Sequence, residues 1–144
     1  MRAKALPLLL ILLASAAPAA ETTGQPPLPS GLELQLGESD FRIYCATCHG
    51  VDGTGTGPVA DFLTLQPADL TQLARKAGGK FPADMLARII DGRAEVKAHG
   101  PRDMPVWGDY FAAEKAGASK SAKEQDVAAR IEALVVYLQS LQAR

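Results

Sequence analysis

The feature that most constrains this chain is the pentapeptide Cys45-Ala46-Thr47-Cys48-His49, which holds both cysteines of the 144-residue sequence. Residues three and four apart share one face of a helix, so a short helical segment presents both thiols and the imidazole on one side. This spacing is typical of a c-type haem attachment site. In such a site the thiols bond covalently to the porphyrin and the imidazole ligates its iron. We therefore predict one haem c, held by Cys45, Cys48 and His49.

Three other uses of this motif are weaker. A thioredoxin-type redox pair also has Cys-x-x-Cys, but it needs a βαβ context that the sequence lacks. A structural zinc site needs four ligands, and the cysteine and histidine candidates are only Cys45, Cys48, His49 and the distant His99. A disulfide across two intervening residues closes too short a loop to stabilise the fold much. Haem attachment remains the leading interpretation.

The first 20 residues predict export. A basic start at residues 1–4 precedes an apolar run at 6–14 and an Ala-x-Ala site, with cleavage expected after Ala19 or Ala20. The apolar run is shorter than the roughly 20 residues that span a bilayer, so a retained anchor is the weaker alternative. We expect a soluble exported product with no membrane span after cleavage. Residues 21–35 are predicted to be a flexible lead-in, and residues 36–144 a single domain.

The charge balance narrows the classes of partner. The formal net charge of −1 becomes −3 once Arg2 and Lys4 are removed with the signal peptide. This argues against a nucleic-acid partner and against a strongly basic docking face. A local basic patch at Lys115, Lys120 and Lys123 is interpreted as either a solvated loop or a docking site.

Apolar periodicity predicts an all-α fold. Gly37, Phe41, Cys45 and Cys48 recur at spacings of four, four and three, which predicts a helix over about 37–48. Further helices are expected over 67–74, 82–92, 109–116 and 123–142, because glycines and prolines punctuate the intervening stretches. We see no convincing strand.

The second axial position on the iron has four possible answers: Met85, Met104, His99 or an open site. Met85 lies among the apolar positions of the 82–92 helix and is interpreted as core. His99 stands beside a Gly-Pro pair that favours an exposed turn. Met104 precedes Pro105 in a loop that can bend over the haem, and the proline stiffens this loop. We therefore predict His49/Met104 ligation, which favours electron transfer, whereas an open iron would bind gases or peroxide.

The chain resembles class I cytochromes c of the small monohaem bacterial periplasmic type, over about residues 36–142. The resemblance rests on the attachment motif at 45–50, the glycine loop at 53–58, Pro67-Ala68-Asp69-Leu70, the segment Met104-Pro105-Val106-Trp107-Gly108, and the end of the last helix, Tyr137-Leu138 with Leu141. It implies four to five helices wrapped around one haem, with the first and last helices crossing where Gly37 and Phe41 meet Tyr137.

The resemblance also implies roles for individual residues. The Pro58 carbonyl would accept a hydrogen bond from His49 Nδ1, and Trp107 would lie near a haem propionate. Arg93 and Arg102 would either neutralise propionates or be solvated. The stretch over 109–123 is longer than in the shortest family members, and we interpret it as a docking insert or a solvated excursion.

The expected function is one-electron transfer in the periplasm, as part of a respiratory chain, between a donor and an acceptor redox partner protein. The chain would then be an electron-transfer protein and not an enzyme, acting as a monomer or as a subunit of a complex. Two alternatives remain open. In the first, the domain is a fixed electron-entry subunit of an oxidoreductase. In the second, Met104 does not ligate, and the domain is a haem protein that senses gas or reduces peroxide.

Overall fold

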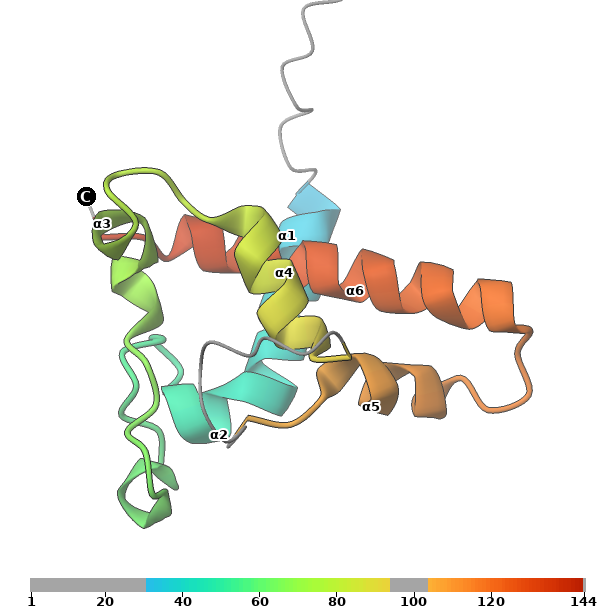
Figure 1. Ribbon diagram of the computed structural model, residues 1–144, viewed down its shortest axis with the longest axis horizontal. Helices are drawn as coiled ribbons and strands as arrows, with labels where there is room; N and C mark the ends of the chain where they lie inside the picture. The colour runs from blue at the N-terminus through green and yellow to red at the C-terminus, as the bar shows by residue number, and fades with distance from the viewer. Residues whose placement is uncertain (1–30, 94–103, 144) are drawn as a thin grey trace, which may run out of the picture.

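The computed structural model describes residues 31–93 and 104–143, and within these ranges the chain is helical with no strand (Figure 1). The prediction of an all-α fold is confirmed. Among the described helices, none combines the length and hydropathy needed to cross a bilayer. The elements in chain order are α1 (Gly31–Asp40), η1 (Phe41–Cys45), α2 (Ala46–His49), η2 (Ala60–Phe62), η3 (Leu70–Gln72), α3 (Leu73–Lys76), α4 (Ala83–Asp91), α5 (Trp107–Glu114) and α6 (Lys120–Ser140).

The first helical segment is longer than expected. It begins at Gly31 and runs through one π-helical turn, η1, to His49. Residues 31–35, expected in the flexible lead-in, are therefore helical. The stretch contains leucines and a glutamate, which favour helix, and Leu34 is half-buried against the core. The expected signal peptide and residues 21–30 lie outside the described part of the chain.

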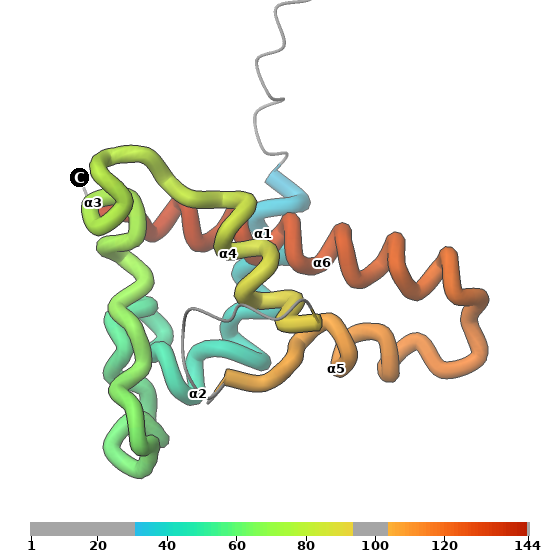
Figure 2. The backbone as a smooth tube through the Cα atoms, viewed as in Figure 1, coloured from blue at the N-terminus to red at the C-terminus, as the bar shows by residue number. Residues whose placement is uncertain are grey.

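The predicted crossing of the first and last helices is confirmed. Figure 2 shows α1 passing across the middle of α6. Gly37 is buried at the crossing, and a methyl group there would overlap the carbonyl oxygen of Ala133. One turn further on, Phe41 is fully buried, and its ring centroid lies 5.2 Å from that of Tyr137. Glycine thus allows the two backbones to approach closely enough for these rings to pack.

Helix α4 matches the predicted bounds within a residue. It ends at Asp91, and the next residue, Gly92, has a φ of 72°, the left-handed conformation that favours glycine after a helix. Leu86 and Ile90 are buried, but Met85 is 41% exposed. The interpretation of Met85 as a core residue is therefore wrong, because the buried stripe of α4 begins at the next residue, Leu86, and continues with Ile90.

The helix expected from Pro67 begins later. Residues 67–69 are in no helix, and Asp69 has an extended backbone. The turn η3 starts at Leu70, and the Asp69 carboxylate accepts a hydrogen bond from Thr71 N at 2.9 Å. An aspartate in this position caps a helix by pairing an amide that has no helical partner. Pro67 therefore lies before the helix and not in its first turn.

Helix α5 brings the region of the predicted insert into the core. Phe111 is fully buried, and the centre of the Arg130 guanidinium lies 3.8 Å from its ring centroid. Arg130 also pairs with Asp40 at 2.8 Å and with Glu114 at 2.6 Å, which ties α6 to α1 and α5. Phe111 is thus packed in the core, whereas most other side chains of the stretch 109–114 are exposed, and the role of the insert stays a prediction.

Candidate haem site

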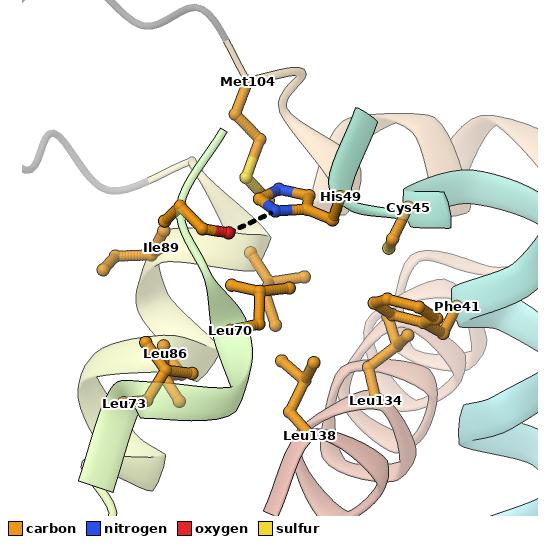
Figure 3. A pocket seen from close by; sticks show the side chains of 12 residues that line it. Phe41, Cys45, His49, Leu70, Leu73, Leu86, Ile89, Met104, Leu134 and Leu138 are labelled. Atoms are coloured by element: carbon orange, nitrogen blue, oxygen red, sulfur yellow. Dashed lines mark hydrogen bonds between the residues drawn. The ribbon is translucent and has the colours of Figure 1, made fainter. Parts of the chain in front are cut away.

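An apolar pocket lies between α4, α6 and the attachment segment (Figure 3). Its empty volume, counted out into the open mouth, is about 650 Å³. Figure 3 shows Cys45, His49 and Met104 toward one end of the pocket and Leu73, Leu86 and Leu138 toward the other. The lining residues are Phe41, Cys45, His49, Ala68, Leu70, Leu73, Leu86, Ile89, Ile90, Met104, Leu134 and Leu138.

Three of the lining side chains carry an atom that can bond to a porphyrin or its iron: Cys45, His49 and Met104. Cys48 lies on α2, one turn after Cys45, and is half-buried. It is not part of the pocket lining. The structure thus brings together residues that stand 59 positions apart in the sequence, Cys45 and Met104. His99, the other candidate for the second axial position, lies outside the described residues.

The His49 imidazole is oriented by a hydrogen bond. Its Nδ1 lies 3.0 Å from the carbonyl oxygen of Ala68, and donation from Nδ1–H leaves Nε2 as the free ring nitrogen (Figure 3). Burial lowers the pKa of His49 below its usual value, and the bond to Ala68 opposes this shift. The imidazole is therefore neutral at pH 7, which is the form that ligates a metal.

The expectation that Pro58 accepts this bond is wrong. The residues on either side of Pro58 bond to the end of α2: Gly57 N donates to Cys48 O at 3.1 Å and Val59 N to Thr47 O at 3.2 Å. Pro58 itself is exposed. The segment around Ala68 packs closer to the imidazole, because Gly55 lets the Pro67 carbonyl approach without a side chain between them.

The electrostatics of Cys45 separate this site from a redox-active dithiol. Burial raises the pKa of the Cys45 thiol to about 12, with smaller contributions from Asp40 and Cys48. Catalytic Cys-x-x-Cys pairs depend on the opposite shift, since the thiolate is the reactive form. A half-buried, protonated thiol facing an apolar pocket fits covalent attachment of a cofactor better than disulfide exchange.

Trp107 and Arg93 lie outside the pocket lining. Trp107 packs in an aromatic cluster, with ring centroids 5.6 Å from Tyr44 and Tyr110 and 6.0 Å from Phe111. The Arg93 guanidinium pairs with Asp91 at 2.5 Å and with Glu124 at 2.9 Å, so two carboxylates already balance its charge. Arg102 lies outside the described residues. The expected place of Trp107 beside a propionate stays a prediction.

The residues present fit a covalently bound haem. The pocket is apolar apart from one neutral imidazole, as a porphyrin face requires, and a thiol, an imidazole and a thioether all reach it. These are the protein atoms that anchor and ligate haem in c-type proteins. An all-α fold with crossed terminal helices and this donor set defines a c-type cytochrome domain.

The comparison with known families agrees. The family described as cytochrome c oxidase, cbb3-type, subunit III, matches residues 33–120, and the chain belongs to this family. The family implies covalently bound haem c and a role in electron transfer. No curated protein matches the chain at a significant level.

Sequence reasoning missed some residues of the site. The leucines at 134 and 138 were predicted as one apolar stripe, but periodicity does not say that this stripe faces the cofactor pocket. Ala68 gave no signal, because it acts through its backbone carbonyl and any residue type could supply that atom. The one signal nearby is Pro67, which has no backbone N–H and so indicates a stretch without regular hydrogen bonding.

Proposed function

We propose that this chain is an exported one-electron carrier whose haem c is attached at Cys45 and Cys48, with His49 and Met104 as axial ligands. The single observation that supports this most strongly is that Cys45, His49 and Met104 line one apolar pocket. When bound, haem iron takes up and releases one electron at a time. The amino-terminal pattern that predicts a signal peptide supports a periplasmic location.

The residues of the chain would set the properties of this centre. The leucines and isoleucines of the pocket exclude water, which favours the less charged reduced iron. A thioether ligand from Met104 also raises the reduction potential, and it closes the iron to small molecules. The protein would thus hold the centre in a form suited to electron transfer and would itself carry out no bond-making chemistry.

The family description favours a second candidate: a dedicated electron-entry subunit of a terminal oxidase. The matched family is named for subunit III of a cbb3-type oxidase, and the match covers residues 33–120. Co-purification of the untagged chain with one oxidase at a fixed ratio, from detergent extracts, would favour this subunit role. Recovery of all of the chain from the soluble periplasmic fraction as a monomer would favour the diffusible carrier.

Substitution of Met104 tests the ligand assignment. In Met104→Ala the near-infrared band of a thioether–iron(III) bond should disappear, and the reduction potential should fall. Met85→Ala is the matched control, because Met85 is an exposed methionine on α4 outside the pocket lining. If Met104→Ala keeps the band and the potential of the wild type, the assignment is wrong.

Carbon monoxide distinguishes the carrier from the gas-binding alternative. Iron closed by His49 and Met104 should leave the spectrum of the reduced wild-type protein unchanged at neutral pH. The Met104→Ala variant should bind carbon monoxide under the same conditions. Binding by the wild type would instead support an open or weakly ligated iron.

A further inference from the structure

We propose that Gln66 is a positioning residue for the axial histidine, because its side-chain amide fixes the carbonyl of Ala68 that accepts the hydrogen bond from His49. The inference rests on the proposed function in one respect, that His49 ligates the iron. It goes further in naming a residue outside the pocket that tunes this ligand.

The glycine loop provides the connection between Gln66 and His49. Gly55 N donates to the His49 carbonyl oxygen at 2.8 Å, so the loop is bonded to the last residue of α2. The carbonyl oxygen of the same residue, Gly55, accepts a hydrogen bond from Gln66 Nε2 at 2.7 Å. Gln66 is therefore connected through Gly55 to the backbone of His49. The imidazole of the same histidine is bonded to the carbonyl of Ala68, two residues after Gln66.

A second contact holds the same segment on the other side of Ala68. Leu70 N donates to the carbonyl oxygen of Gly53 at 2.7 Å. Ala68 thus lies midway between two attachments to the glycine loop, one made by the Gln66 side chain and one by the backbone. With both ends held, its carbonyl stays 3.0 Å from His49 Nδ1.

Gly55 makes this close approach possible. Its φ is +86°, a conformation that residues with a side chain rarely adopt, and a methyl group there would overlap the Pro67 carbonyl oxygen. The loop and the segment at 66–70 are consequently in backbone contact. Of the two attachments, the Gln66 side chain is the one that a substitution can remove without changing the backbone.

Loss of the Gln66 bond has a predictable effect on the iron. A hydrogen bond from Nδ1–H to a carbonyl increases the basicity of the imidazole, and a more basic ligand stabilises iron(III). When the Ala68 carbonyl is held from one side only, the hydrogen bond from His49 Nδ1–H lengthens on average. The imidazole then donates less electron density to the iron. The reduction potential should therefore rise.

The test uses the haem-loaded protein and three variants. Gln66→Ala removes the amide, and Gln66→Met removes it while keeping the length of the side chain. Gln72→Ala is the matched control, because Gln72 is a glutamine of the neighbouring turn whose Nε2 bonds Thr71 Oγ1 at 3.0 Å and not the glycine loop. The readouts are the reduction potential and the hydrogen-exchange rate of His49 Nδ1–H by NMR.

We expect the oxidised-to-reduced ratio of both Gln66 variants, at a fixed solution potential, to fall by up to about tenfold, which is a rise of about 59 mV for a one-electron couple. Exchange of the Nδ1 proton should accelerate in the same variants, and the Gln72 variant should match the wild type. A Gln66→Met protein with wild-type potential and exchange would overturn the inference. So would an equal change in Gln72→Ala.

Failure of the proposed function would look different. In that case the wild-type protein itself would lack covalent haem or a low-spin His/Met spectrum, before any variant is compared. If Gln66→Ala loads haem poorly, Gln66→Met supplies the same comparison, since its side chain fills the same space. An intact spectrum with an unchanged potential counts against Gln66 alone.

Discussion

Replacement of Phe41 by alanine tests the helix crossing on which the fold depends. Phe41 is fully buried, its ring packs 5.2 Å from Tyr137, and it also lines the haem pocket. Removing a buried phenylalanine side chain costs about 3–5 kcal/mol, as the lost transfer free energy and the cavity combine. Because a domain of this size is stable by only about 5–15 kcal/mol, the variant should lose roughly a fifth or more of its stability.

Phe62 provides a control of the same residue type. It is 86% exposed in the turn η2, so Phe62→Ala should change the free energy of unfolding by no more than about 0.5 kcal/mol. Both variants keep Cys45, Cys48, His49 and Met104, and both are compared in the haem-loaded form.

The measurement is equilibrium denaturation by guanidinium of the haem-loaded proteins, followed by helical circular dichroism. We expect a lower midpoint for Phe41→Ala at an unchanged slope, and a thermal midpoint lower by roughly 10–20 °C. A loss below about 1 kcal/mol for Phe41→Ala, or an equal loss for Phe62→Ala, would refute the assignment of Phe41 to the core.

Two further predictions concern packing and charge. Gly37→Ala should destabilise the protein by about 1–3 kcal/mol, because overlap with the Ala133 carbonyl outweighs the gain of about 1 kcal/mol in helix propensity. A neutral or more stable variant in the same denaturation assay would contradict a close crossing of α1 and α6. The second prediction concerns Asp91. The hydrogen bond from Arg93 holds the pKa of Asp91 below its usual value. The contribution of Asp91 to stability is therefore present above about pH 4 and is lost as the pH falls through the lowered pKa. Asp91→Asn should therefore be less stable than the wild type at pH 7, by under about 1 kcal/mol for this partly exposed pair, and the difference should narrow at pH 3. Urea midpoints at the two pH values measure it, and a difference independent of pH would count against the ion pair.

Much of the fold could be predicted because its signals are local. The spacing of Gly37 and Phe41 before Cys45 indicates one helical face, and the stripe from Val127 to Leu138 indicates another; both faces are buried where predicted. Glycine after α4 also marked the end of that helix correctly. These features depend on residues close together in the sequence, where helical geometry dictates which side chains meet.

The errors arose where the deciding contact is between distant segments. The acceptor for His49 is a backbone carbonyl, and its position depends on how the glycine loop packs against residues 66–70. Met85 was assigned to the core because an apolar stripe does not show which of two adjacent positions faces inward. The packing of α5 depends on Arg130, which stands 16 residues after Glu114 in the sequence and also bonds Asp40, 90 residues before it.

The attachment of haem to Cys45 and Cys48 is the central claim, and one measurement tests it most directly. The protein is expressed with a haem-attachment system, purified, and run on a denaturing gel stained for haem, with stoichiometry taken from the alkaline pyridine spectrum. We predict one haem per chain that stays with the polypeptide, and none in the Cys45→Ala, Cys48→Ala double variant. A colourless wild-type protein, or haem that leaves the denatured chain, would contradict the account.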